Sequence, residues 1–174
     1  MNITAFSGIV FGIITGLVIC VILFRYANKD KKIKTSYDER QEAIRNRGYK
    51  YAFYTVLAYE TVLLCFGMAR GHLPIPSYAL NFLGIILGCT VLGVYCVLKD
   101  AFWGMNNDHR RYFIIFAVTG VLNLIPVLGS YITGTLISDG EFTAPIINLM
   151  VMIMLLALMI ALAVKKVMLK ESDN

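Results

Sequence analysis

Glu60 is the residue whose position most demands a chemical explanation. It lies in the middle of the apolar stretch 51–70. An ionisable side chain at the centre of a membrane-spanning helix costs at least about 2.5 kcal/mol on insertion scales. Such a residue either binds a proton or a cation, or it stays neutral and hydrogen-bonds a neighbouring helix. We favour the second interpretation, because a transport path usually contains more than one ionisable group.

Three other polar side chains are predicted at the same depth as Glu60. Counting about 1.5 Å per helical residue from the basic flank of each apolar stretch puts all four at roughly 13–17 Å. The set is Thr15, Glu60, Thr90 and Asn123. Four helices could therefore share one polar layer, with Asn123 or a tyrosine as the hydrogen-bond partner of Glu60.

No other residues have the spacing of a catalytic or metal site. The chain lacks the zinc-protease, phosphate-loop and serine-hydrolase motifs. Its two histidines, His72 and His109, are each isolated in a predicted loop, and its four cysteines lie inside apolar stretches without a Cys-x-x-Cys pair. We expect no catalytic residue, no cofactor and no metal ion, and therefore no enzyme.

The composition explains which elements must position Glu60. The 174 residues are 58% hydrophobic and 16% charged, with a mean hydropathy of +0.70. A soluble domain would be about 25% charged. The apolar residues gather in runs of about 20, the length of a helix that crosses a bilayer. We predict one all-α transmembrane domain over residues 1–174, a polytopic helical bundle with spans at about 3–24, 51–70, 79–98, 113–136 and 145–164.

The positive charges predict how these spans are oriented. If the stretches cross the membrane, fifteen of the sixteen Lys and Arg residues fall on one side, and only Arg70 on the other. Lys and Arg accumulate in cytoplasmic loops. We therefore predict an outside N-terminus, a cytoplasmic C-terminus and contact of the basic side with anionic headgroups. Nucleic acid is not an expected partner, because the basic residues flank the spans.

The connector 25–50 is predicted to be basic and cytoplasmic, with a short helix at 37–50. Ser36 and Glu39 have the spacing of a capping box. Gly48 is a plausible bend; without one, the helix continues into the second span. The segment either docks a protein or the lipid surface, or simply sets the entry angle of that span. The residues of the docking hypothesis are Ser36, Asp38, Glu39, Arg40 and Ile44.

Residues 37–44, with Arg47, Gly48 and an aromatic-rich span after them, resemble a motif of uncharacterised small bacterial multi-pass membrane proteins. In these proteins an Asp-Glu-Arg triplet, here Asp38-Glu39-Arg40, and a following Ile precede a transmembrane helix. The resemblance covers about 17 residues. It implies a Gram-positive-type bacterial inner-membrane protein and implies no activity.

Two glycine patterns predict close helix packing. Gly8, Gly12 and Gly16 recur at every fourth position of the first span, and Gly84 and Gly88 do so in the third. A spacing of four puts small residues on one helix face, where two backbones can approach closely. Packing within one chain and homodimer formation are both consistent with the patterns.

Three functions are consistent with the sequence. The first is an accessory or regulatory subunit that binds another membrane protein or a cytoplasmic protein, within a homo-oligomer or a larger membrane complex. The second is a small oligomeric transporter or channel component that uses Glu60. The third is an envelope-stress or antimicrobial-peptide sensing or immunity protein that uses His72 and residues 139–141 of the outer loops.

Overall fold

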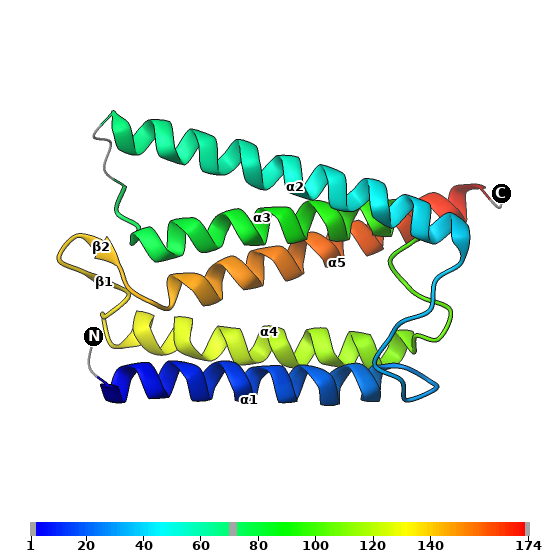
Figure 1. Cartoon of the computed structure of the whole chain (residues 1–174), viewed down its shortest axis with the longest axis horizontal. Helices are drawn as coiled ribbons and strands as arrows, with labels where there is room; N and C mark the ends of the chain where they lie inside the picture. Colours follow the sequence, from blue (N-terminus) through cyan, green and yellow to red (C-terminus); the bar gives the residue numbers. More distant parts are fainter. Residues whose placement is uncertain (1–2, 70–72, 173–174) are drawn as a thin grey trace. The chain divides into compact units, whose positions relative to one another are not determined.

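The computed structural model describes residues 3–69 and 73–172, without the side chains of residues 3–9, 13 and 169–172. Figure 1 shows five long helices and one short hairpin. The helices are α1 (Ile3–Ala27), α2 (Glu39–Met68), α3 (Ser77–Leu98), α4 (His109–Ile132) and α5 (Ile146–Ser172). All five are long and apolar enough to cross a membrane. The predicted all-α fold with five spanning helices is confirmed.

The second helix follows the alternative in which Gly48 does not break the connector helix before the second span. α2 is continuous for 30 residues and passes through Gly48 without a break. Gly48 is buried against α3, where an added methyl group would lie 2.9 Å from Leu92 Cδ1 and 3.2 Å from Tyr95 Cδ1. Here glycine therefore allows close packing and does not bend the helix.

Two other helix ends lie away from the expected positions. α4 ends at Ile132, and Gly134 follows with a φ of +68° in the left-handed region where only glycine is unstrained. α5 continues to Ser172, beyond the apolar stretch, because its basic C-terminal residues still favour a helix. Pro126 is accommodated inside α4.

The chain forms two compact units, which are described separately. Unit 1 contains Met1–Asp38 and Trp103–Ile115, and unit 2 contains Glu39–Phe102 and Phe116–Asn174. α1 belongs to unit 1, whereas α2, α3 and α5 belong to unit 2. α4 is divided between the two.

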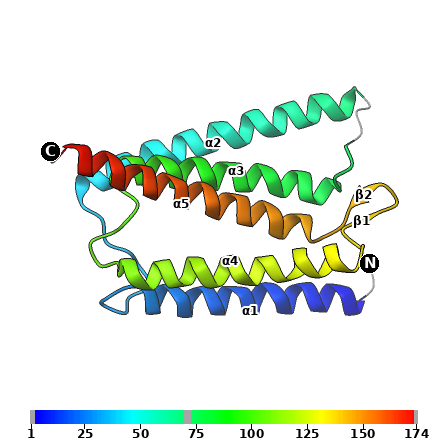
Figure 2. The same cartoon turned by 180° about the vertical axis from the view of Figure 1, so that it is seen from behind.

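In unit 2, α3 packs against both α2 and α5, and Figures 1 and 2 show it between them. Its glycines make this close packing possible. A methyl group added at Gly88 would lie 2.6 Å from Val56 Cγ2 of α2, and one added at Gly93 would lie 2.5 Å from Leu158 Cδ2 of α5. Ile86 of α3 and Met150 of α5 belong to the buried core.

A two-stranded antiparallel hairpin, β1 (Ile137–Ser138) and β2 (Glu141–Phe142), joins α4 to α5. Its turn is Asp139-Gly140, with φ values of +53° and +81°. Positive φ at both central residues is the geometry of the type I′ turn that Asp-Gly favours. We name the end of unit 2 that carries this hairpin the hairpin end, and the opposite end, which carries Arg40 and Lys165, the basic end.

Candidate functional site

Two adjoining hollows lie at the hairpin end, between the last turns of α2 and the first turns of α3. Their volumes are about 300 and 440 Å³, the second being the more open groove, and they share Leu63, Gly67 and Asn81. Small-molecule sites usually measure about 300–1,000 Å³. We name the two together the acidic cavity. Its apolar walls include Leu63, Leu64, Phe66, Leu73, Ile75 and Leu80, and its polar side chains are Glu60, Ser77, Asn81 and Glu141.

The acidic cavity lies where two side chains of α2 meet the backbone of α3. A methyl group built on Gly84 would lie 2.6 Å from Glu60 Oε1 and 2.8 Å from Tyr59 Cδ1. The Tyr59 hydroxyl also donates to Leu80 O at 2.9 Å. One turn closer to the basic end, Gly88 meets the smaller Val56. Tyr59 and Glu60 are larger than Val56, so they hold the helices further apart. Figures 1 and 2 show α2 diverging from α3 toward the hairpin end.

Glu60 is half-buried in the wall of this cavity. Among the described residues, no hydrogen bond joins its carboxylate to another side chain. Asn123, its expected partner, donates instead to Thr119 O of its own helix at 2.8 Å. The carboxylate is therefore next to space that a ligand can enter.

Glu141 reaches the acidic cavity from the hairpin. Its neighbour Phe142 donates its backbone N–H to Pro74 O at 2.9 Å, which attaches β2 to the connection between α2 and α3. Thr143 Oγ1 donates to Thr135 O at 2.8 Å and fixes the other side of the hairpin. Glu141 is thus held in the lining of the cavity by one backbone and one side-chain hydrogen bond of its neighbours.

The described lining of the acidic cavity contains two carboxylates, one amide and one hydroxyl, and no basic side chain. The described residues contain no group of three or more His, Cys, Asp or Glu that could hold a metal ion. His72 and Arg70, which precede Leu73 in the same connection, lie outside the described residues.

The other members of the predicted polar layer bond within their own helices or lie elsewhere. Thr90 Oγ1 donates to Ile86 O at 2.7 Å, as Asn123 does to Thr119 O. Each side chain donates a hydrogen bond to the carbonyl at position i−4 of its own helix. Thr15 is exposed on α1 of unit 1. No described contact joins these three residues to Glu60.

At the basic end, polar side chains join α2 to the C-terminus of α3. Asp100 has a φ of +58°, and Ala101 N donates to Cys96 O, which is a common helix-ending arrangement. Three side chains of α2 donate to carbonyls of the segment that follows α3: Arg40 to Lys99 O, Gln41 to Asp100 O and Arg45 to Ala101 O, at 3.4, 3.2 and 3.4 Å.

Lys165 of α5 joins the same region. Its ammonium lies 2.8 Å from Asp100 Oδ2 and donates to Leu98 O at 3.2 Å. We name these donors together with residues 98–101 the α3 cap cluster. Arg40, expected to contact a partner protein or lipid, is thus also used within the chain. Asp38 and Glu39 are exposed, and Ile44 is half-buried.

Unit 1 is held together by hydrogen bonds between its two loops. The Asn106 side chain donates to both oxygens of Asp30, at 3.1 and 3.2 Å, and to Lys34 O at 3.1 Å. It also accepts a bond from the backbone N–H of Ser36 at 2.8 Å. In the predicted capping box, the backbone N–H of Ser36 would donate to the Glu39 side chain. Because this N–H donates to Asn106 instead, the predicted reciprocal bonds between Ser36 and Glu39 are not formed. α2 instead begins directly after Asp38, a residue type favoured before a helix.

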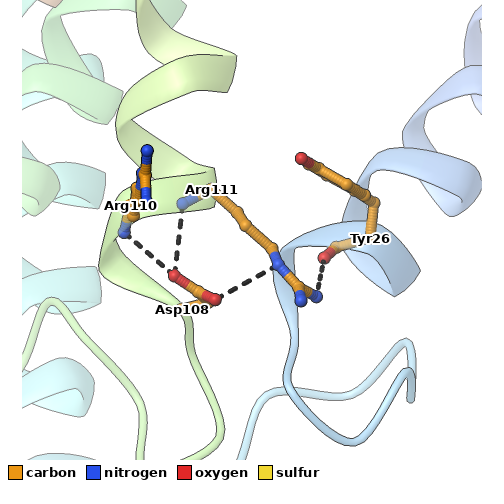
Figure 3. Close-up of polar contacts among 4 residues, drawn as sticks. All are labelled: Tyr26, Asp108, Arg110 and Arg111. Atoms are coloured by element: carbon orange, nitrogen blue, oxygen red, sulfur yellow. Dashed lines mark hydrogen bonds and ion pairs between the residues drawn. The ribbon is translucent and has the colours of Figure 1, made fainter.

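Asp108 caps the start of α4 and ties it to α1 (Figure 3). Its Oδ1 accepts from the backbone N–H groups of Arg110 and Arg111 at 3.1 and 3.3 Å. Its Oδ2 lies 3.1 Å from Arg111 Nε, and Arg111 Nη1 donates to Tyr26 O, near the end of α1, at 3.0 Å. These hydrogen bonds pair backbone groups at the start of α4 and near the end of α1, so the arrangement has a structural role.

Asp30 and Asn107 are the two other notable polar groups of unit 1. The backbone N–H of Lys32 and the Asn106 amide donate to the Asp30 carboxylate, and they hold its pKa below the ordinary value. Asn107 is 4% exposed, and its Oδ1 has no described hydrogen-bond donor. The sequence Asn106-Asn107-Asp108 before a helix is the signal that could have identified this loop contact.

The two glycine patterns have different surroundings. Gly84 and Gly88 lie in the α2–α3 interface. At Gly12 and Gly16 of α1, an added methyl group would meet none of the described atoms within 4 Å. Gly8 belongs to the residues whose side-chain surroundings are outside the description. Gly84 and Gly88 thus serve packing inside the chain, whereas no described atom packs closely against Gly12 or Gly16.

Sequence reasoning missed two parts of the acidic cavity. Asn81 lies near the end of the predicted span 79–98, where a polar side chain can reach water, so the sequence gives no signal for it. Glu141 was expected only as part of an outer loop, although Asp139-Gly140 is the dipeptide typical of a tight hairpin. That dipeptide could have predicted where Glu141 is held.

No protein-family model, curated protein or solved structure matches this chain. The resemblance of residues 37–44 to uncharacterised bacterial membrane proteins therefore stays a prediction. Five apolar helices of spanning length identify the chain as an integral multi-pass membrane protein.

Proposed function

We propose that the chain is a non-enzymatic protein of the bacterial inner membrane that works as a small oligomeric transporter or channel component. Glu60 is its intramembrane ionisable site, and the acidic cavity is the entrance from the outer side. The observation that carries this proposal is the place of the Glu60 carboxylate, which lines a cavity and has no described hydrogen bond to another helix.

Glu141 supplies the second ionisable group that a path needs. It lines the same cavity at the hairpin end, which the charge distribution predicts to face outward. An ion that arrives from outside meets Glu141 first and Glu60 deeper in the span. Carboxylates in membrane helices commonly mark such ion and proton paths.

Proton flux into liposomes tests this proposal. Purified protein is reconstituted with a trapped pH-sensitive dye, and a potassium diffusion potential drives the flux. We expect Glu60→Gln to lower the flux at least tenfold, whereas Asp139→Asn, on the same hairpin but outside the described lining, leaves it unchanged. Flux no greater than in empty liposomes, or equal flux in wild type and Glu60→Gln, would reject the proposal.

The glycine pattern of α1 favours a second candidate, an accessory subunit that binds another membrane protein. No described atom lies within 4 Å of a methyl group built on Gly12 or Gly16, so a partner helix could approach closely there. At the predicted cytoplasmic end of α1, the exposed Lys29, Lys31 and Lys32 are suited to anionic headgroups.

Co-purification in mild detergent followed by mass spectrometry tests the second candidate. We expect the double variant Gly12→Leu and Gly16→Leu to lose the partner protein. The matched control is Gly129→Leu, because Gly129 of α4 also has no described atom within 4 Å of an added methyl group. Equal recovery with both variants would remove the α1 face as the binding surface.

A further inference from the structure

We infer that unit 1 binds the headgroup of an anionic phospholipid at residues 29–34, which we name the lysine turn, together with Arg25 of α1. The charge distribution predicts only that the whole basic side of the chain contacts anionic headgroups. Unit 1 narrows this contact to one folded site with a preference for one class of lipid. The site is independent of the acidic cavity and of transport, because the described lining of that cavity belongs to unit 2.

The backbone of the lysine turn is held from two sides. The backbone N–H of Lys29 donates to Asn106 O at 2.7 Å, and the Asn106 side chain donates to Lys34 O at 3.1 Å. On the other side, the fully buried Asn28 side chain donates to Lys32 O at 2.8 Å. These bonds fix the course of a charged segment that would otherwise be a solvated loop.

The lysine turn folds back on the last turn of α1. Lys31 has a φ of +55°, and its backbone N–H donates to Asn28 O at 3.2 Å. Its carbonyl accepts a hydrogen bond from Arg25 Nε at 3.4 Å, so the guanidinium lies beside the turn. No described hydrogen bond uses the two terminal nitrogens of Arg25. A guanidinium can donate two parallel bonds to a phosphate, so Arg25 is suited to hold the lipid phosphodiester.

The lysine side chains take no part in holding the turn. All four are exposed, and no hydrogen bond or ion pair joins their ammonium groups to a described residue. The one acid of the turn, Asp30, accepts hydrogen bonds from the Lys32 backbone N–H and the Asn106 amide. The whole of unit 1 has seven Lys and Arg residues against three Asp residues. Like charges fixed this close repel each other, and an anion bound among them relieves the repulsion.

The surroundings of the lysine turn favour a lipid over a soluble phosphate. α1 is long and apolar enough to cross a membrane and ends at Ala27. The turn after it therefore lies at the level of the lipid headgroups when α1 spans the bilayer. Ile33, between two of the lysines, is 53% exposed, and Phe24, next to Arg25, is 46% exposed. These apolar side chains can contact the acyl chains of a lipid, whereas a soluble phosphate would leave them in water.

Native mass spectrometry of the purified full chain, released from detergent with added lipid, tests the inference. We expect dioleoyl phosphatidylglycerol to bind at least tenfold more tightly than either of two matched probes. Dioleoyl phosphatidylcholine has the same chains and phosphate but adds a cation, and glycerophosphoglycerol is the same headgroup without chains. Equal binding of phosphatidylcholine would overturn the preference for an anionic lipid. Equal binding of glycerophosphoglycerol would overturn a lipid as the occupant.

A pair of lysine substitutions locates the site. Lys31→Gln together with Lys32→Gln removes two ammonium groups that make no described hydrogen bond or ion pair, so this variant should fold. We expect it to bind phosphatidylglycerol at least fivefold more weakly. The matched control is Lys99→Gln together with Lys166→Gln, two exposed lysines of unit 2, which should change binding less than twofold. An equal loss in both variants would mean that only net charge matters and would overturn the site.

Asn106→Ala distinguishes a folded site from a loose run of charges. It keeps every Lys and Arg but removes the side-chain bonds to Asp30 and to Lys34 O. We expect phosphatidylglycerol to bind at least threefold more weakly, because the ammonium groups are no longer held together. Unchanged binding would overturn the fixed turn as the binding site.

Discussion

The two ends of the α2–α3 pair are built in opposite ways. At the basic end, glycines bring the helices into close contact, and side chains of α2 and α5 donate to the carbonyls that end α3. At the hairpin end, Tyr59 and Glu60 hold the helices apart and a cavity opens between them. The comparison indicates that one helix pair can serve as scaffold at one end and as a binding site at the other. The difference depends on the size of the α2 side chains that meet two consecutive contact glycines of α3, Gly84 and Gly88.

The largest effect is expected from closing the space at Gly88. In Gly88→Ala the new methyl group lies 2.6 Å from the branched, stiff Val56 side chain. Overpacking of this kind costs about 1–3 kcal/mol. The control at the hairpin end is Gly67→Ala, where an added methyl group meets no described atom within 4 Å. Thermal unfolding in detergent should show a lower Tm for the first variant only, and equal Tm values would contradict the contrast in packing.

Removing a donor from the α3 cap cluster should have the next largest effect. Arg45 donates to Ala101 O and to Tyr49 OH, at 3.4 and 3.1 Å. A hydrogen bond to a charged group contributes about 1.5–3 kcal/mol, and because the bond to Ala101 O is long, Arg45→Ala should lower the free energy of unfolding by only about the lower figure. Proteolysis near residues 99–102 should increase together with the loss of stability. Arg45→Lys keeps the charge and should recover part of the lost stability. A wild-type digestion pattern in Arg45→Ala would show that Arg45 does not stabilise the α3 cap cluster.

A smaller effect is expected at the hairpin end, where one hydroxyl joins the helices. Tyr59→Phe removes the 2.9 Å bond to Leu80 O. A neutral hydrogen bond contributes about 0.5–1.5 kcal/mol. We expect a modest fall in the free energy of unfolding and faster amide exchange in the last turns of α2, with exchange at the basic end unchanged. Faster exchange at both ends would mean that they do not behave independently.

The smallest effect is expected for the ion pair between Lys165 and Asp100. The Asp100 side chain is 51% exposed, so solvent screens the 2.8 Å contact. Partly exposed pairs of this kind contribute about 0–1 kcal/mol. Asp100→Asn should therefore change the Tm less than Tyr59→Phe, and raising the salt concentration should lower the wild-type Tm toward that of the variant. A larger change in Tm than for Arg45→Ala would mean that this ion pair is the main stabilising contact of the α3 cap cluster.

The sequence predicted the helices well because spanning length and apolar content are properties of a single segment. The contacts around Glu60 could not be predicted in the same way. Depth along a span gives the height of a side chain but not the direction in which it points, and Thr90 and Asn123 bond within their own helices. Which side chain of α2 faces Gly84 and which faces Gly88 depends on helix rotation, which hydropathy does not encode.

The connector was harder to predict because its hydrogen bonds join distant parts of the chain. Asn106 contacts Asp30 and Ser36 more than 65 residues away in sequence. The spacing of Ser36 and Glu39 indicated a local cap, but the Asn106 side chain takes the same backbone donor. The local capping box is therefore replaced by a hydrogen bond to a residue distant in the sequence. Gly48 is likewise explained by distant residues, because its close neighbours in α3 leave no room for a side chain.

The unbroken course of α2 has a mechanical consequence. Thirty helical residues make a stiff rod about 45 Å long. One end of this rod is held by the carbonyls at the end of α3, and Glu60 lies about 32 Å along it from the first residue. A tilt of only a few degrees about the held end would therefore displace the carboxylate by an ångström or more. α2 can act as a lever arm, through which an event at the basic end changes the width of a crevice near the hairpin end.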